Sequence, residues 1–204
     1  MKTQPTQKRS RQRVAEILKV TEQLVLEMPL EDITPTEIAK RAGLTRTSLY
    51  HFFPSKYEIF DALATQYYEE LQERVLKFFD PDERKNYRLA WAGISGIYAD
   101  YFNKQPAAAI LLLGRKDAKQ FSFTDTQSNS LVADDLRRLM KDYTDLPEHA
   151  GSSVPGVDIF QIIVELMTAT FSFGMRKEGR ISKKISEEAK NASLAYIDTR
   201  IRPG

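Results

Sequence analysis

The sequence contains no cysteine and only two histidines, His51 and His149. The lack of cysteine excludes disulfides, thiolate nucleophiles and cysteine-ligated metal sites, and it fits a reducing compartment. Because the chain has only two histidines, we do not expect a histidine-rich metal centre. The chain also lacks a glycine-rich phosphate loop and a His-x-x-His pair, and the adjacent carboxylates of Asp134 and Asp135 diverge around a helix. We therefore expect no enzyme activity, no metal and no cofactor.

Long uninterrupted apolar runs are missing as well. The most apolar stretch, residues 157–175, contains Asp158, Gln161 and Glu165, which a membrane span rarely tolerates. The first residues, MKTQPTQKRSRQRV, are basic and polar and lack the apolar centre of a secretory signal. Hydrophobic residues still make up 42% of the 204 residues, which is enough for a buried core. We expect a soluble cytoplasmic protein with no membrane partner.

Positive charge is concentrated near the amino terminus. Residues 1–56 hold ten Lys/Arg and six Asp/Glu, a net charge of +4, whereas residues 57–204 have a net charge of −2. A basic arm ahead of a small helical segment favours contact with nucleic-acid phosphates, although an ordinary solvated tail has the same composition. The basic residues that precede the first acid are Lys2, Lys8, Arg9, Arg11 and Arg13.

Two helices are predicted in the next residues. The apolar side chains of residues 14–28 recur at the spacing of one helix face, in which Thr21 occupies one of the positions. Pro29 ends this helix. A second helix starts at Thr34-Pro35-Thr36-Glu37, in which the first threonine is the N-cap, the proline takes the first helical position and the glutamate closes a capping box. Gly43 stops this helix in a left-handed conformation.

A third short helix follows after a turn, with Thr45 as its N-cap and Pro54 after its end. Two short helices joined by a turn that contains glycine are typical of a helix-turn-helix motif. At 100° per residue, Leu49, Phe52 and Phe53 share the side that we assign to the core. The other side carries no acid and consists of Arg46, Thr47, Ser48, Tyr50 and His51.

This polar side fits the major groove of DNA. Short hydroxyl side chains let the backbone approach the groove floor, and Arg46 can donate two hydrogen bonds to one guanine. A bland solvated surface is the alternative, but such a surface would be expected to carry Glu, Lys and Gln. Ser55 and Glu58 predict another capping box, which opens a fourth helix. Its free amides and Lys56 can hold a phosphate, and simple capping by Ser55 is compatible with that role.

The stretch LTRTSLYHFFPSKYEIFDAL, residues 44–63, resembles the most diagnostic segment of the TetR/AcrR family of bacterial transcriptional regulators. The preceding ITPTEIAKRAG, residues 33–43, is similar to the first helix and turn of the family's motif, and the resemblance covers about residues 10–63. It implies an all-α subunit of about nine helices. A three-helix DNA-binding head would occupy residues 1–56, and a helical body that binds a small molecule and dimerises would occupy residues 57–204.

The resemblance also implies roles for side chains of the head. Arg46 and Thr47 would meet base edges, and Tyr50 and His51 would hold phosphates. Lys56 would clamp the DNA backbone at the start of the fourth helix. Many relatives carry a different residue at the position of Arg46, so the operator sequence is not implied. The full set of expected DNA contacts is Thr36, Arg46, Thr47, Ser48, Tyr50, His51 and Lys56.

Helical spacing continues through the remaining residues, without β alternation or an internal repeat. The expected elements are a fourth helix ended by Asp80-Pro81, helices over about 83–104, 106–114 and 131–143, a polar loop after residue 114 and a surface loop over 146–156.

The last two expected helices predict a homodimer. Residues 157–175 are apolar nearly all round, whereas a helix on the surface of a monomer would have a polar half. The last two helices of one subunit and those of its two-fold mate would form a four-helix interface. We favour this arrangement over burial within a monomer, because helix-turn-helix proteins usually read palindromes as dimers. The final helix, residues 186–201, would pack through Ala189, Ala192, Tyr196 and Ile197.

Aromatic residues of the fifth and eighth helices mark a candidate ligand pocket, because helical bundles commonly hold ligands between helices. A stripe of aromatic residues is more often core, so this alternative stays open. Glu165 is an acid in an apolar helix, and it can bind a cationic ligand, pair with an arginine or point to solvent. The candidate pocket residues are Trp91, Tyr98, Phe102, Glu165 and Phe171.

Together these features predict a ligand-responsive transcriptional regulator. We favour a repressor that a small-molecule inducer releases from a palindromic double-stranded operator. The alternative is a DNA-binding regulator of the same fold without a ligand, of the nucleoid or division type. An open apolar cavity with converging polar groups would favour the first, and a body filled by side chains would favour the second.

Overall fold

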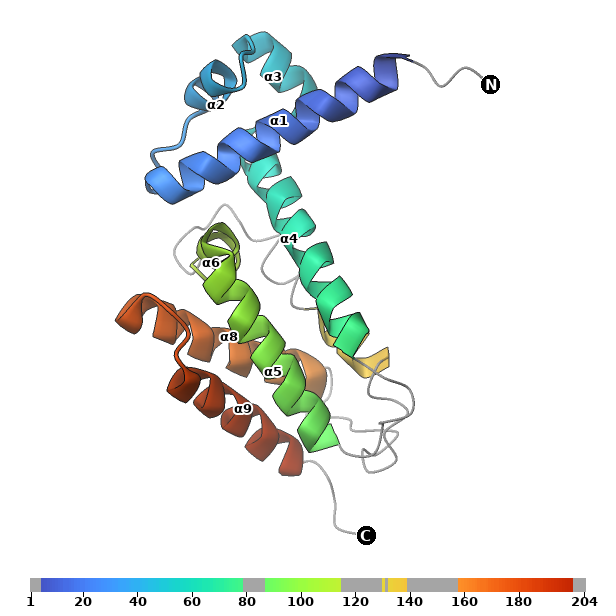
Figure 1. Ribbon diagram of the computed structural model, residues 1–204, viewed down its shortest axis with the longest axis vertical. Helices are drawn as coiled ribbons and strands as arrows, with labels where there is room; N and C mark the ends of the chain where they lie inside the picture. The colour runs from blue at the N-terminus through green and yellow to red at the C-terminus, as the bar shows by residue number, and fades with distance from the viewer. Residues whose placement is uncertain (1–4, 79–86, 115–129, 131, 139–157, 200–204) are drawn as a thin grey trace. The chain divides into compact units, whose positions relative to one another are not determined.

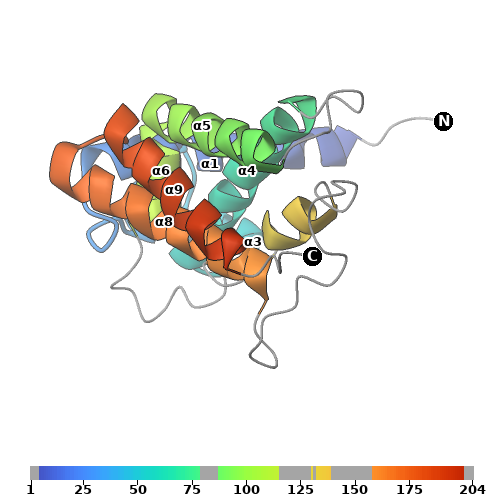
Figure 2. The same ribbon diagram turned by 90° about the horizontal axis from the view of Figure 1, so that it is seen from below.

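The computed structural model describes residues 5–78, 87–114, 130, 132–138 and 158–199, and its elements are α-helices (Figures 1 and 2). A helical segment over residues 132–138, yellow in Figure 1, lies between α6 and α8 in the sequence. The expected all-α class is confirmed. The helices are α1 Pro5–Glu27, α2 Pro35–Arg41, α3 Arg46–Phe52, α4 Lys56–Phe78, α5 Tyr87–Lys104, α6 Pro106–Leu113, α8 Ile159–Glu178 and α9 Lys183–Asp198.

The chain forms two compact units, Met1–Tyr67 and Tyr68–Gly204. α4 contributes its first part to one unit and its second part to the other. Some expected features lie outside the described residues. They are the break at Asp80-Pro81, the loop over 115–129, the end of the helix expected over 131–143 and the loop over 146–156.

The N-caps that the sequence predicts for α2 and α3 are present. The backbone N–H of Glu37 donates to the side chain of Thr34 at 3.2 Å, and the N–H of Ser48 donates to the side chain of Thr45 at 3.1 Å. Gly43 has a φ of 64°, which is the left-handed conformation that glycine adopts without strain. Each helix of the motif therefore has a fixed start, and the turn between them has a fixed geometry.

α1 extends further toward the amino terminus than expected. It begins at Pro5, whereas the apolar pattern begins at Val14. Proline suits the first helical position, and Lys, Arg and Gln are good helix formers, so the helix continues past the residues that pack. The basic residues that precede the core are thus helical and exposed rather than a tail, and they are Lys8, Arg9, Arg11 and Arg13.

One arginine joins α1 to α2 within the first unit. Arg41 donates to Glu27 of α1 at 2.8 Å and to Glu37 of α2 at 3.1 Å. These hydrogen bonds raise the pKa of Arg41, and the bond from Arg41 lowers the pKa of Glu27. Beneath this exposed pairing, Thr21 is buried and donates to the carbonyl of Ile17 at 2.7 Å, so it fills its place in the apolar face as expected.

In the second unit, α8 and α9 lie side by side (Figures 1 and 2). The buried ridge of α9 consists of Ile185, Ala189, Ser193 and Ile197. The expected packing of Ala189 and Ile197 is confirmed, whereas the expectation for Ala192 is wrong, because its side chain is exposed. α9 also begins earlier than predicted, at Lys183, because Ser182 caps it by accepting from the N–H of Ile185 at 3.5 Å.

Polar side chains connect the helices of the second unit. Asn103, near the end of α5, donates to the carbonyl of Ile181 and accepts from its N–H, both at 2.8 Å. Ser172 of α8 donates to the carbonyl of Leu113 at 2.8 Å. These bonds fix the turn after α8 and the end of α6. Within the described ranges, none of the helices is both long enough and apolar enough to cross a membrane.

We predict that Gly174→Ala destabilises the second unit. A Cβ at this position would lie 2.7 Å from Cγ2 of Ile185 and 3.3 Å from the carbonyl oxygen of Arg180, so α8 and the following turn would have to move apart. The free energy of unfolding should fall by about 1–3 kcal/mol in urea titrations at fixed protein concentration. Gly96→Ala is the control, because a Cβ there has no neighbour within 4 Å, and it should raise stability by about 0.5–1 kcal/mol. Equal effects of the two substitutions would contradict the close approach.

Candidate DNA-binding surface and ligand pocket

α3 presents a polar, acid-free face to solvent. Leu49 is 1% exposed and anchors the opposite side, as expected, while Phe52 and Phe53 are half-buried. Thr36 of α2, in the same unit, is also exposed. The exposed side chains of α3 are Arg46, Thr47, Tyr50 and His51.

Arg46 and Tyr50 of this face form a pair. Nη2 of Arg46 donates to the hydroxyl of Tyr50 at 3.3 Å, and the guanidinium carbon lies 5.7 Å from the centroid of the tyrosine ring. The two residues are four positions apart, which places them on one side of the helix. The pairing restricts the orientation of the guanidinium before any DNA is bound, so a change at Tyr50 also affects Arg46.

Ser48 differs from its neighbours, because its hydroxyl takes part in the helix cap. Thr45 accepts from the backbone N–H of Ser48 and donates its own hydroxyl proton to Oγ of Ser48 at 2.9 Å. The side chain of Ser48 is half-buried. His51 lies edge-on to the ring of Phe52, with centroids 5.6 Å apart, and this contact orients the imidazole. The hydroxyl of Thr47 is thus more accessible to DNA than the hydroxyl of Ser48.

The ammonium group of Lys56 holds the connection between α1 and α2. It donates to the carbonyls of Leu30, Glu31 and Ile33 at 3.1, 3.0 and 2.8 Å. Burial lowers the pKa of Lys56, and the carboxylates of Glu31 and Asp32 oppose that shift. An ammonium has three protons, and these three bonds use them all. A phosphate contact by Lys56 would therefore require one of these bonds to break.

The candidate pocket residues of the second unit do not form a single site. Trp91, Phe102 and Phe171 are buried, and the rings of the last two meet edge to face with centroids 6.4 Å apart. Glu165 lies on the exposed side of α8. Of the five candidates, Tyr98 lines the pocket described below, and the other four do not line it. The others belong to the core or the surface, because an aromatic stripe by itself does not distinguish a core from a cavity.

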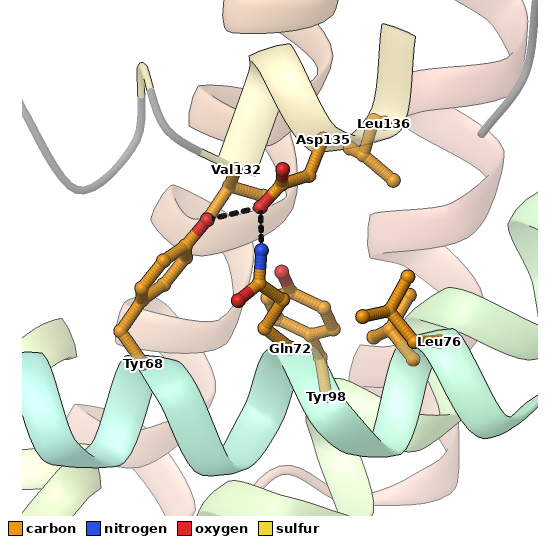
Figure 3. Close-up of a pocket in the computed structure, with 8 residues that line it drawn as sticks. Tyr68, Gln72, Leu76, Tyr98, Val132, Asp135 and Leu136 are labelled. Atoms are coloured by element: carbon orange, nitrogen blue, oxygen red, sulfur yellow. Dashed lines mark hydrogen bonds between the residues drawn. The ribbon is translucent and has the colours of Figure 1, made fainter. Parts of the chain in front are cut away.

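The pocket lies between α4, α5 and the segment 132–138 (Figure 3). At its centre, Oδ2 of Asp135 accepts from the hydroxyl of Tyr68 at 2.5 Å and from the side-chain amide of Gln72. The pocket volume is about 10 Å³, close to the minimum for one water molecule. Its lining residues are Tyr68, Gln72, Val75, Leu76, Tyr98, Val132, Asp135 and Leu136.

Both tyrosines of the pocket remain protonated at neutral pH. Burial raises the pKa of Tyr68, and its hydrogen bond to Asp135 raises it further. Burial and the negative charge of Asp135 raise the pKa of Tyr98 in the same direction. Among the lining residues, Asp135 is the one acidic side chain. In the part of the chain that the structure describes, there is no cluster of three or more metal-ligating side chains.

Sequence reasoning missed Tyr68, Gln72 and Asp135. Tyr68 and Gln72 are four residues apart on α4, a spacing that places them on one helix face, but this spacing occurs on every helix. In the sequence, Asp135 stands out only as one of the two adjacent carboxylates Asp134 and Asp135. Its partners are 67 and 63 residues away in the sequence, so no local pattern identifies them.

We predict that Lys56→Met destabilises the head. The substitution removes three hydrogen bonds and leaves three loop carbonyls without their donor, so the free energy of unfolding should fall by about 1–2 kcal/mol. Thermal unfolding followed by circular dichroism measures the change. Lys40→Met, at an exposed position of α2, should have little effect. If both variants unfold like the parent protein, Lys56 does not stabilise the connection.

The comparisons with known proteins agree with this geometry. Residues 17–63 match the family model of the bacterial regulatory proteins of the tetR family. A TetR-family transcriptional regulator from Streptomyces coelicolor superimposes with a TM-score of 0.66 at 21% identity, covering 93% of this chain and 99% of that one. A TetR transcriptional regulator from Rhodococcus sp. RHA1 gives a TM-score of 0.58 at 18% identity, covering 96% and 97%. Likeness at these identities shows a shared fold.

Two further relatives extend the comparison. The TetR family transcriptional regulator PfmR from Thermus thermophilus has a TM-score of 0.53 at 20% identity, covering 92% of this chain and 95% of that one. The nucleoid occlusion factor SlmA of Haemophilus ducreyi is 27% identical over 90 residues, or 43% of each protein, so the match spans less than half of that relative. Residues 17–63 thus match the tetR family of bacterial regulatory proteins, and the chain as a whole shares its fold with solved regulators of that family.

Proposed function

We propose that the chain is a ligand-responsive repressor that binds a palindromic operator as a homodimer in the cytoplasm. The observation that carries this proposal is the exposed, acid-free face of α3, held outward by the burial of Leu49. A helix of this composition fits the major groove, where it can read base edges. The exposed basic residues of α1 add sequence-independent attraction to phosphates.

In this proposal, contacts with DNA are divided between bases and phosphates. Arg46 and Thr47, at the start of α3, contact base edges, and the bond from Arg46 to Tyr50 limits the directions in which the guanidinium donates. Tyr50 and His51 contact phosphates, with Thr36 of α2 as a further contact. Ser48 and Lys56 serve mainly to fix the position of α3, because their polar groups already have partners within the head.

The outward side of α8 supports dimerisation. Ile162, Leu166 and Ala169 are only half-buried, and Phe173 is 47% exposed, so apolar surface remains on the side away from the core. A helix with apolar residues on both sides requires a second cover. A two-fold copy of α8 and α9 supplies that cover and places two recognition helices about 34–36 Å apart, in successive major grooves.

Release from DNA would proceed through α4. This helix starts immediately after the recognition helix in the sequence and carries Tyr68 and Gln72 of the pocket. A ligand that moves these residues would move α4 and change the separation of the two heads. A coupling free energy of about 1–3 kcal/mol would change operator affinity by roughly 5- to 150-fold.

Two buried donors of α5 support a ligand in the body. Within the described residues, Nε1 of Trp91 and the hydroxyl of Ser95 are buried without a hydrogen-bond partner. Buried polar groups rarely remain unpaired, because each costs about 1–3 kcal/mol. A bound molecule with acceptor atoms would satisfy both groups.

A second function is favoured by two other observations. The described pocket has room for about one water molecule, and the chain is similar in part to a nucleoid occlusion factor. A DNA-binding regulator without an inducer would need no larger cavity. The two functions differ in one measurement, since only the first predicts that a small molecule lowers affinity for the operator.

The test of operator binding starts from selection of bound sequences out of a random duplex pool. The selected duplex is then titrated with the protein by fluorescence anisotropy at several salt concentrations. We expect a palindromic site bound at least about a thousandfold more tightly than random DNA. Binding that is equally strong on all sequences and depends steeply on salt would defeat the proposal.

We predict that Thr47→Ala weakens binding to the selected operator by about tenfold, because a contact with a base edge is lost. Tyr50→Phe should weaken binding to random DNA as well, because it removes a phosphate contact, and the loss of the acceptor of Arg46 should add to its effect on the operator. Thr65→Ala is the matched control, since Thr65 is an exposed helical threonine that donates to the carbonyl of Asp61. Unchanged affinity in both α3 variants would overturn the assignment of contacts.

We also predict that Phe173→Glu produces monomers, because it places a charge in the proposed interface. Sedimentation equilibrium should show a dimer for the parent protein and a monomer for this variant. Leu26→Glu, at an apolar position of α1 that is 53% exposed, should remain dimeric. A dimeric Phe173→Glu variant would place the interface elsewhere.

A further inference from the structure

The pocket of Figure 3 has an uneven distribution of hydrogen bonds around one carboxylate. Oδ2 of Asp135 accepts from both Tyr68 and Gln72 on α4. Oδ1 has its nearest described cation in Arg138, whose Nη1 is 3.9 Å away, beyond hydrogen-bond distance. The side chain of Arg138 is 78% exposed, so its attraction is weakened by solvent. One oxygen of the carboxylate therefore keeps most of its capacity to accept.

The remaining lining of the pocket is neutral. Tyr68, Gln72 and Tyr98 supply uncharged polar groups and two aromatic rings, whose faces attract cations. A ligand carboxylate would be repelled by Asp135, and a neutral ligand would leave its charge uncompensated. The other lining residues form an apolar wall and are Val75, Leu76, Val132 and Leu136.

The size of the pocket limits the charged group that can enter. A volume of about 10 Å³ admits one water molecule, and a primary ammonium group is of similar size. Leu76 of the apolar wall is itself exposed, so the wall reaches the molecular surface. A chain attached to the ammonium group can follow this wall outward without a larger internal cavity.

We propose that this pocket binds the primary ammonium group of an amphipathic amine, with Asp135 as its counter-ion. The ammonium group donates to Oδ1 of Asp135 beside the rings of Tyr68 and Tyr98, and the alkyl part leaves the pocket along exposed Leu76. Because a cation bound at Oδ1 draws negative charge away from Oδ2, it weakens the bonds from Tyr68 and Gln72 and so loosens the attachment of α4 to the segment 132–138. The assignment identifies the chemical class of the inducer and so rests on the proposed ligand-responsive function.

Isothermal titration calorimetry of the full chain tests the proposal with three probes of equal chain length. Octylamine is a cation at neutral pH, octan-1-ol is neutral and octanoate is an anion. We expect octylamine to bind at least about tenfold more tightly than the other two. Equal affinity for all three probes, or tighter binding of octanoate, would overturn the proposal.

A pair of isosteric variants locates the counter-ion. Asp135→Asn should weaken octylamine binding by about tenfold to hundredfold, because it removes the charge but keeps an oxygen that accepts from Tyr68. Asp134→Asn removes the same charge one residue away, at an exposed side chain paired with Arg137, and should change the affinity by less than about twofold. Equal losses in both variants would show general electrostatic attraction and refute the pocket.

Folding and function are measured separately. Circular dichroism reports whether the Asp135→Asn variant is folded. If this variant does not fold, the comparison of the three probes on the parent protein still tests the proposal. Titration of the operator in the presence of octylamine tests repression. Binding that depends on Asp135 but leaves operator affinity unchanged would confirm the amine site and refute the inducer function. If the protein binds its operator but binds octylamine no more tightly than the other two probes, the amine site is refuted and operator binding is not.

Discussion

The burial of Leu49 determines which side of α3 faces outward. A seven-residue helix is too short to be stable by itself, so its orientation depends on tertiary packing. Leu49 supplies the buried contact, Thr45 fixes the start of the helix and Gly43 allows the sharp turn before it. The polar face of Arg46, Thr47 and Tyr50 has one direction only because these three constraints act together.

The other constraints of the head act through the backbone. Arg41 ties α2 to the end of α1, and Lys56 ties the start of α4 to the connection between α1 and α2. Both side chains are cations within a segment of positive charge, yet each is used inside the head. Positive charge that connects the head internally and positive charge that is proposed to attract phosphates have the same appearance in the sequence.

In the body, a few polar groups fix the arrangement of apolar helices. Asn103 bonds to both backbone groups of Ile181, and Asp135 bonds to two side chains of α4. An apolar interface tolerates sliding, whereas a hydrogen-bonded polar pair is satisfied in one register only. The attachment formed by Asp135 differs from the others because it lies at a pocket and is incomplete on one oxygen.

The sequence by itself determined the caps of α2 and α3 and which side of α3 is polar, because these depend on residues within one or two helical turns. It also predicted the apolar character of α8. Only the tertiary structure decided that Lys56 bonds to loop carbonyls, that Trp91 and Phe171 are core and that Tyr68, Gln72 and Asp135 form the pocket. These outcomes depend on residues tens of positions apart, and an aromatic or charged side chain has the same local signature whether it packs, pairs or lines a cavity. Contacts between distant residues follow from how the helices pack, and that packing is a property of the whole chain rather than of any segment.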